Sequence, residues 1–260
     1  MTCMNGLVIV RGGGDLATGT IYRLWKAGFQ VLSLEVERPL VVRRTVAVAE
    51  AVFDGFAVVE GMRAEKISSC SEFDPACGVN ILVDPEGESI KRMRPQIVID
   101  AIIAKRNTGT YREMAPLVIG LGPGFSAPND VHVVIETNRG HNLGRAIWNG
   151  CAEPNTGHPG DIMGYGRERL LRAPASGPMQ QFKRIGDSVL KGELIAEVAG
   201  KPVTAGVFGV VRGLIHPSVI VTEGLKIGDV DPRNDASYCK TISDKALSIA
   251  GGVLEAILSR

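Results

Sequence analysis

A glycine-rich segment near the start of the chain has the residue types that bind phosphate groups. Residues 12–17 read GGGDLA, which gives the pattern G-x-G-x-x-A between an apolar run and a helical pattern. Glycines let the backbone turn sharply and approach a pyrophosphate, and the free amides at a helix N-terminus attract the anion. We therefore predict that the phosphate end of a ligand binds at this turn, on Gly12, Gly13, Gly14 and Asp15. The carboxylate of Asp15 competes with phosphate there, so a different ligand pose stays open.

An acidic residue stands where such sites bind a ribose. Glu35 lies 23 positions after Gly12, at the end of the apolar run 30–35. A carboxylate at that place accepts hydrogen bonds from ribose hydroxyls, which is the role we predict for Glu35. Arg43 and Arg44 come soon afterwards, and they either hold a phosphate or another anionic group or are solvated surface arginines.

A second group of polar residues follows the apolar run 96–103. Asp100 falls at the carboxyl end of a predicted strand, and Lys105, Asn107 and Thr108 come just after it. Open α/β sheets bind ligands at that edge. We expect these residues to form the far side of the pocket; the alternative is an ordinary loop.

No catalytic constellation is identifiable in the sequence. Glu136, Arg139 and His141 lie within six residues, and acid–base chemistry needs such groups, but no partner nucleophile is visible. An ion-pair and turn role is therefore the default, and whether the chain is an enzyme stays open. Cys70 and Cys77 are too far apart for a C-x₂-C knuckle and have no nearby histidines, so we predict no metal site.

The elements that must position these residues alternate between strands and helices. Apolar runs predict buried strands, and spacing of apolar residues at helical intervals predicts helices. The predicted strands are 6–11, 30–35, 56–60, 96–103 and 116–121, and the predicted helices are 15–27, 42–54 and 243–259. Alternation of this kind favours an α/β fold with an N-terminal Rossmann-like parallel sheet.

The later part of the chain has the pattern of a small β domain. Residues 185–193 (IGDSVLKGE) and 207–213 (VFGVVRG) resemble a lipoyl- or biotinyl-like hammerhead. Those carriers bear a modified lysine in a Met-Lys or Asp-Lys tip. Lys201 lacks that context, so we expect no covalent lipoyl or biotin group.

Four segments follow from these patterns. We predict a nucleotide-binding domain, a turn-rich connection, the lipoyl-like β domain and a C-terminal helix, at residues 1–125, 126–166, 167–235 and 236–260 respectively.

Composition limits the cellular location and the classes of partner that we expect for the protein. The 260 residues are 45% hydrophobic and 22% charged, with a net charge of +1. This charge gives no reason to expect nucleic acid or a membrane surface as partner. The N-terminus lacks the pattern of a signal peptide, and five scattered cysteines make no disulfide framework. We expect a cytoplasmic protein.

Seven strings in order along the chain carry a family resemblance. They are VIVRGGGDLATG (8–19), LEVERPLVVRRTVAVAEAVFDG (34–55), VIDAIIAKRNTGT (98–110), GLGPGF (120–125), VIETNRGHNLGR (134–145), EPNTGHPG (153–160) and KIGDVDPR (226–233). Together they resemble the YqeB-type accessory proteins of selenium-dependent molybdenum hydroxylase systems. The resemblance implies a bacterial cytoplasmic factor that helps to mature a molybdenum hydroxylase client, with kinship to XdhC-type chaperones.

Three functions stay open at this point. The resemblance favours a maturation factor that binds a nucleotide, a dinucleotide or a molybdopterin-type cofactor. An NAD(P)-dependent oxidoreductase would use the same turn, with Lys105 or His141 as proton donor. A non-catalytic scaffold would keep the fold and act through contact with a partner enzyme.

Overall fold

The chain forms two compact units, each built from segments that are not contiguous in sequence. A computed structural model describes residues 6–157 and 160–259. Unit 1 comprises Met1–Pro39, Ala47–Thr156 and Ile242–Arg260, and unit 2 comprises Leu40–Val46 and Gly157–Thr241. The predicted candidate residues therefore fall into two bodies, because the segment 40–46 belongs to unit 2.

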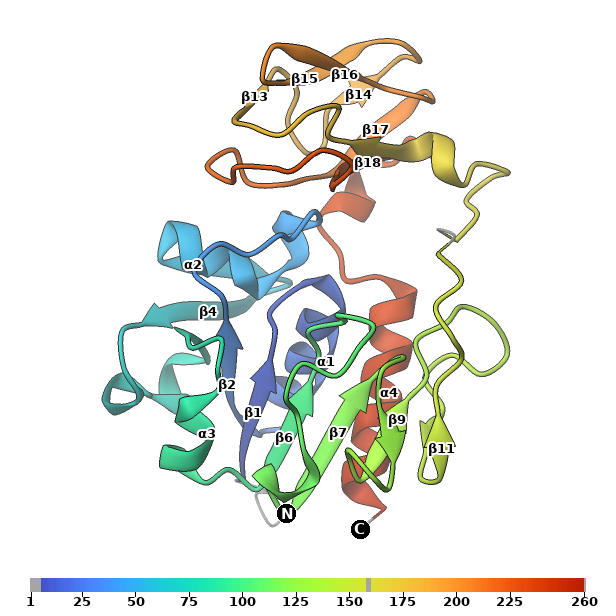
Figure 1. Cartoon of the computed structure of the whole chain (residues 1–260). Helices are drawn as coiled ribbons and strands as arrows, with labels where there is room; N and C mark the ends of the chain where they lie inside the picture. Colours follow the sequence, from blue (N-terminus) through green and yellow to red (C-terminus); the bar gives the residue numbers. More distant parts are fainter. Residues whose placement is uncertain (1–5, 158–159, 260) are drawn as a thin grey trace. The chain divides into compact units, whose positions relative to one another are not determined.

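Unit 1 is organised around a nine-stranded mixed sheet (Figure 1), in the order β10-β9-β7-β6-β1-β2-β5-β4-β3. The strands are β1 Leu7–Arg11, β2 Gln30–Glu35, β3 Phe56–Val59, β4 Met62–Ile67, β5 Val79–Val83, β6 Ile97–Asp100, β7 Leu117–Leu121, β9 Val133–Ile135 and β10 Ala146–Ile147. Pairs from β4 to β9 are parallel, and the edge pairs β3–β4 and β9–β10 are antiparallel. A further small pair joins β8 Ser126–Ala127 to β11 Gly150–Cys151.

Buried apolar residues explain the central strands. Val8, Ile9, Val98, Val118 and Ile119 are all fully buried, and β-branched side chains suit strands that are covered on both faces. Because the central strands are parallel, their carboxyl ends meet at one edge of the sheet. That edge carries the glycine-rich turn.

Helices cover the sheet unevenly. The α-helices are α1 Asp15–Lys26, α2 Ala51–Asp54, α3 Glu88–Met93 and α4 Asp244–Leu258. The helices α1 and α4 pack closely, since a Cβ added at Gly19 would lie 2.7 Å from the Cβ of Ala246. Between β6 and β7 the chain makes only the single 3₁₀ turn η5 Arg112–Met114. None of the helices among the described residues combines the length and apolarity that crossing a membrane requires.

The prediction of a Rossmann-like parallel sheet is wrong. The sheet is mixed, with antiparallel pairs at both edges, and several crossovers lack a regular helix. The predicted helix 42–54 is also wrong, since it is divided into the 3₁₀ turns η1 Arg44–Val46 and η2 Val48–Glu50 and the short α2. The chain passes from unit 2 to unit 1 within this stretch, and one continuous helix would not let its two halves pack in separate bodies.

Unit 2 consists of two antiparallel sheets. One has the order β12-β18-β17-β14 and the other β13-β15-β16. Their strands are β12 Leu170–Arg172, β13 Met179–Gln181, β14 Ser188–Val189, β15 Leu194–Val198, β16 Lys201–Thr204, β17 Gly209–Leu214 and β18 Lys226–Asp231, with the 3₁₀ turns η6 Arg167–Arg169 and η7 Ala236–Cys239 nearby in sequence.

The prediction of a lipoyl-like hammerhead for this region is also wrong. The unit is not a contiguous small domain, because residues 40–46 are built into it and the N–H of Leu214 donates to the carbonyl of Val42 at 2.9 Å. Buried ion pairs add polar structure, such as Arg169 with Asp229 at 3.0 Å. Short strands joined by glycine-containing turns occur both in a hammerhead and in this two-sheet unit, so the sequence pattern did not distinguish the two folds.

Candidate ligand site at the carboxyl ends of the parallel strands

The glycine-rich turn connects β1 to α1 and is tightly packed by other parts of unit 1. Gly12 has a φ of +99°, and a Cβ there would lie 2.9 Å from the carbonyl oxygen of Ala101. At Gly13 a Cβ would lie 3.0 Å from the amide nitrogen of Ala49, whose N–H donates to the Gly13 carbonyl at 2.9 Å. Gly12 and Gly13 therefore have no room for a side chain, because backbone segments from other parts of unit 1 pack directly against them.

Glu35 holds the turn from the end of the neighbouring strand. Its Oε1 accepts the N–H of Gly13 at 2.8 Å, and its Oε2 accepts the N–H of Val36 at 2.8 Å. Burial raises the pKa of Glu35, while these two backbone hydrogen bonds act to lower it. Both carboxylate oxygens are engaged with the backbone, and the predicted contact with a ribose stays a prediction.

The start of α1 is the less buried part of the turn. Gly14 is the N-cap residue, has ordinary extended φ and ψ angles, and makes no side-chain cap hydrogen bond. Gly14, Asp15 and Leu16 are half-buried, whereas Gly12 and Gly13 are buried. The amides of a helix start carry partial positive charge, so this end of α1 favours an anion.

A lysine that sequence analysis missed stands near this helix start. Lys245 lies in the first turn of α4, which begins at the same edge of the sheet and runs back along it (Figure 1). Burial and the charge of Arg139 lower the pKa of Lys245, and the carboxylates of Asp15, Glu136 and Asp244 act to raise it. Because Lys245 is more than 200 residues away from the glycine-rich turn in sequence, no local sequence pattern predicts that it lies near the start of α1.

Glu136 has a structural role at the end of β9. The side chain is buried, its Oε1 accepts the amides of Thr137 and Asn138 at 2.7 and 2.6 Å, and its Oε2 accepts the amide of Glu153 at 2.7 Å. Arg139 forms a bidentate pair with Asp244 at 2.9 and 3.0 Å. These contacts fix the loop that follows β9 against the start of α4.

A buried polar network links the ends of β1 and β6. Arg11 Nη1 donates to Thr110 Oγ1 at 2.5 Å, and this hydroxyl donates to Asp100 Oδ2 at 2.5 Å. Arg11 and Asp100 form an ion pair at 3.4 Å, and all three residues are at most 4% exposed. Asp100 thus lies at the predicted edge, but its carboxylate is committed to the protein. Arg11 was not among the residues predicted from the sequence. The signal that could have identified it is its position as a charged residue directly after the apolar run 7–10.

The other residues of the predicted far side form a turn above this network. Asn107 Oδ1 accepts the amides of Gly109 and Thr110 at 2.9 and 2.8 Å, and its Nδ2 donates to the Thr110 carbonyl at 2.7 Å. Lys105 and Thr108 are exposed. Asn107 shapes the loop, while Lys105 and Thr108 are accessible to a ligand.

The structure does not place the two candidate arginines in the unit that carries the turn. Arg43 Nη2 donates to the carbonyls of Tyr238 and Thr241 at 2.9 and 3.1 Å, and Arg44 Nε donates to the carbonyl of Leu214 at 2.8 Å. All five residues belong to unit 2. The site assembled within unit 1 therefore consists of the turn, Glu35, Asp100, the loop 101–110 and Lys245.

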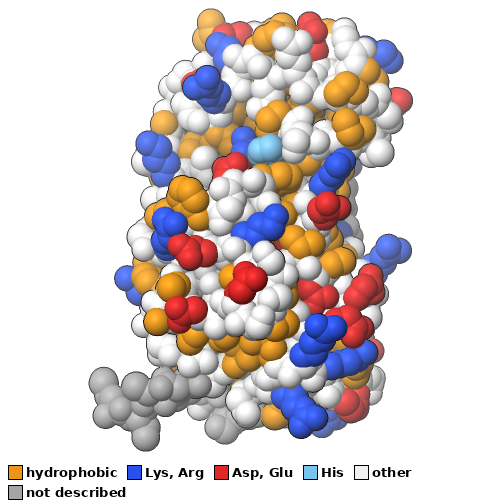
Figure 2. All heavy atoms as spheres, turned by 90° about the vertical axis from the view of Figure 1, so that its left-hand side faces the viewer, with side chains coloured by type: hydrophobic (Ala, Val, Ile, Leu, Met, Phe, Trp, Pro, Cys, Tyr) orange, Lys and Arg blue, Asp and Glu red, His pale blue; other side chains and the backbone are white. Residues whose placement is uncertain are grey.

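Charge on the molecular surface is mixed. Figure 2 shows basic and acidic side chains intermingled over the face it presents. This pattern accords with the net charge of +1, and it gives no single-sign field on that face that would attract a polyanion.

Comparison with known proteins identifies one closely similar sequence. No family model matches the chain. The chain is 48% identical over 255 residues, 97% of its length, to a protein of Escherichia coli (strain K12) described as "Uncharacterized protein YqeB", and it spans 47% of that protein's length.

Similarity to solved structures is remote. The ectoine utilization protein EutE (DoeB) from Ruegeria pomeroyi matches with 12% identity, a TM-score of 0.27 and coverage of 87% of this chain and 85% of that one. A succinylglutamate desuccinylase from Silicibacter sp. TM1040 matches with 12% identity, a TM-score of 0.25 and coverage of 87% and 84%. The sequence comparison thus supports the resemblance to YqeB-type proteins, because nearly the whole of this chain is similar to YqeB.

Proposed function

We propose that the chain is a bacterial cytoplasmic accessory factor for a selenium-dependent molybdenum hydroxylase. It binds a nucleotide, a dinucleotide or a molybdopterin-type cofactor by its phosphate at the start of α1. The observation that carries the ligand site is the half-buried helix start at Gly14, where the N-cap residue makes no side-chain cap hydrogen bond and where Lys245 is close enough to Asp15 to interact with its charge. The role as an accessory factor rests on the resemblance of the seven sequence strings to YqeB-type accessory proteins, and the chain is 48% identical to a protein described as YqeB.

The residues at the start of α1 fit a phosphate, although one of them, Asp15, carries a negative charge that opposes its binding. The first amides of a helix have no acceptor within the helix, and a phosphate oxygen accepts hydrogen bonds from such amides. Lys245 supplies a positive charge, and the carboxylate of Asp15 opposes the binding of a fully ionised phosphate. The buried contacts of Gly12, Gly13 and Glu35 hold the turn so that these amides are already oriented.

Ligand titration with a charge-bearing variant tests this proposal. Native mass spectrometry of the purified chain would be followed by titration with ATP, CTP, NAD(H), NADP(H) and molybdopterin cofactor. Gly14→Asp places a carboxylate on the helix start, where Asp is a favourable N-cap, so the fold is retained while phosphate is repelled. Gly14→Ala is the matched control, because it adds a methyl group without charge or cap.

Each result separates the three functions. Binding of a mononucleotide or molybdopterin cofactor that is lost in Gly14→Asp and kept in Gly14→Ala supports the proposal. Binding of NAD(P)H alone would favour an oxidoreductase. If Gly14→Asp still matured the hydroxylase in cells as well as the unaltered chain, the ligand site would be irrelevant and the chain would act as a scaffold.

A further inference from the structure

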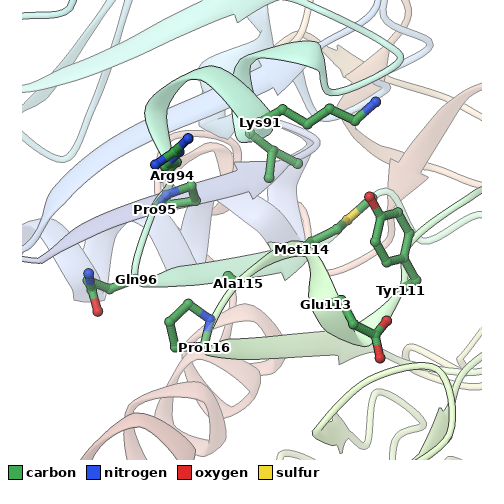
Figure 3. A pocket seen from close by; sticks show the side chains of 10 residues that line it. Lys91, Arg94, Pro95, Gln96, Tyr111, Glu113, Met114, Ala115 and Pro116 are labelled. Carbon is green, nitrogen blue, oxygen red and sulfur yellow. The ribbon is translucent and has the colours of Figure 1, made fainter.

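Unit 1 contains a pocket that has no residue in common with the glycine-rich turn. It has a volume of about 680 Å³ and lies between α3, η5 and the amino ends of β6 and β7 (Figure 3). Small-molecule sites usually measure roughly 300–1,000 Å³. The β6–β7 crossover contains the 3₁₀ turn η5 in place of a full helix, and residues of this turn line the pocket.

One wall of the pocket carries two basic side chains. Lys91 belongs to α3, and Arg94 follows it as the C-cap residue in the left-handed region with a φ of +47°. The ion pair of Lys91 with Glu88 is long, at 3.6 Å, and the Lys91 side chain is 68% exposed, so this pair neutralises little charge. Both side chains border the pocket, and Figure 3 shows them extending in different directions, with the Lys91 ammonium on the side of Tyr111.

The opposite wall supplies a flat aromatic and apolar surface. The Tyr111 side chain is exposed, and Met114 is half-buried against the hydrophobic core of the sheet. Figure 3 shows the Met114 side chain extending toward the Tyr111 ring, with the Glu113 carboxylate below them. A planar ring stacks on such a surface, and the carboxylate accepts hydrogen bonds from an amine on that ring.

This wall is held in place by the buried network described above. Thr110 precedes Tyr111 and is fixed through its hydroxyl by Arg11 and Asp100. The Asn107 side chain additionally donates to the Thr110 carbonyl at 2.7 Å. The backbone that presents Tyr111 is thus ordered before any ligand arrives, which lowers the entropic cost of binding.

We propose that this pocket binds a nucleoside monophosphate whose base carries an exocyclic amine. Lys91 and Arg94 bind the phosphate, Tyr111 and Met114 contact the base, and Glu113 accepts the hydrogen bond of the amine. The volume, the two basic side chains, the aromatic ring and the single carboxylate among the lining residues support that chemistry. The proposal does not depend on the ligand of the α1 site.

Calorimetric titration of the full chain tests the pocket. The ligands are AMP, CMP and GMP, with UMP lacking the amine, adenosine lacking the phosphate and ribose 5-phosphate lacking the base. We expect the amine-bearing monophosphates to bind with a Kd below about 1 mM and each incomplete ligand to bind about tenfold more weakly, since one charged or stacking contact contributes about that factor.

Variants identify the site. Arg94→Gly removes the cation at a φ that glycine adopts freely, so weaker binding is not a consequence of misfolding, and Tyr111→Leu removes the ring. Arg92→Gln is the control, because Arg92 lies on the same exposed helix and does not line the pocket. Arg94→Gly and Tyr111→Leu should each weaken AMP binding about tenfold, and Arg92→Gln should not.

Gly14→Asp separates the pocket from the α1 site. AMP binding that persists in Gly14→Asp and is weakened about tenfold when Arg94→Gly is added supports the pocket, whatever the α1 site binds. Absence of binding by every monophosphate, or binding to the Gly14→Asp chain that survives the addition of both Arg94→Gly and Tyr111→Leu, would overturn the proposal.

Discussion

The Oε1 atom of Glu35 accepts the backbone N–H of Gly13 at 2.8 Å. This hydrogen bond joins the end of β2 to the turn that follows β1, so an acidic residue of the protein satisfies an amide of the glycine-rich turn. In the function proposed above, the ligand therefore contacts the amides at the start of α1, one residue further along the chain. The contact also fixes the shape of the turn.

The packing at Gly13 predicts a large difference between two glycine substitutions. In Gly13→Ala the new Cβ would lie 3.0 Å from the Ala49 amide and 3.1 Å from Val48 Cγ2, so we expect a loss of about 1–3 kcal/mol in the free energy of unfolding. Gly251→Ala in α4 is the control, because a Cβ there meets nothing within 4 Å, and alanine should stabilise the helix by about 0.5–1 kcal/mol. Urea denaturation measures both, and equal effects would refute the packing role of Gly13.

The buried network predicts unequal effects for three further variants. Asp100→Ala leaves the Arg11 guanidinium buried without its carboxylate and should cost about 3–5 kcal/mol of unfolding free energy. Thr110→Val removes one hydroxyl and should cost about 1–3 kcal/mol. Thr108→Val, at an exposed position of the same loop, should change stability by less than about 0.5 kcal/mol. A Thr110→Val chain as stable as the Thr108→Val chain would contradict the network.

The raised pKa of Glu35 predicts a pH dependence of stability. Burial raises this pKa above 4.5, so the folded state binds a proton at pH values where the unfolded state has lost it. Stability relative to Glu35→Gln should therefore fall as the pH rises from about 4.5 through the folded-state pKa, and then stay constant. Unfolding free energies of both chains across that range measure the difference, and a difference that grows with pH would show the opposite shift.

Lys245 is predicted to be a reactive amine. Burial and the nearby Arg139 lower the pKa of Lys245, whereas the hydrogen bond to Glu193 raises the pKa of the similarly half-buried Lys183. At pH 9 a larger fraction of Lys245 is neutral, so an acylating reagent should modify it first, as peptide mass spectrometry would show. Faster modification of Lys183 would contradict this. A phosphate ligand at α1 should protect Lys245 and leave Lys183 unprotected.

Local sequence patterns predicted the elements around the turn. The expected strands 6–11 and 30–35 and helix 15–27 correspond to β1, β2 and α1, and the expected helix 243–259 corresponds to α4. Each of these has an uninterrupted apolar period and a clear end signal, such as Gly28 with a φ of +87° after α1. The meeting of Asp100 and the turn at one sheet edge also followed from parallel strand pairing.

Contacts between distant segments could not be predicted. The pattern G-x-G-x-x-A has the same form whether the glycines make room for a ligand or for Ala49 and Ala101. Similarly, the roles of Arg11 and Lys245 depend on residues far away in sequence, and the division of 42–54 depends on which unit each half joins. The antiparallel edges of the sheet arise from pairings that single apolar runs do not specify.

Amide chemical shifts test the central claim most directly. A ¹⁵N-labelled chain would be titrated with pyrophosphate, and backbone resonances would be followed through the titration. The account predicts shifts centred on Gly14, Asp15 and Leu16 that are abolished by Gly14→Asp and retained in Gly14→Ala. Saturable shifts confined to other residues, or none at any pyrophosphate concentration, would contradict binding of a phosphate at the start of α1.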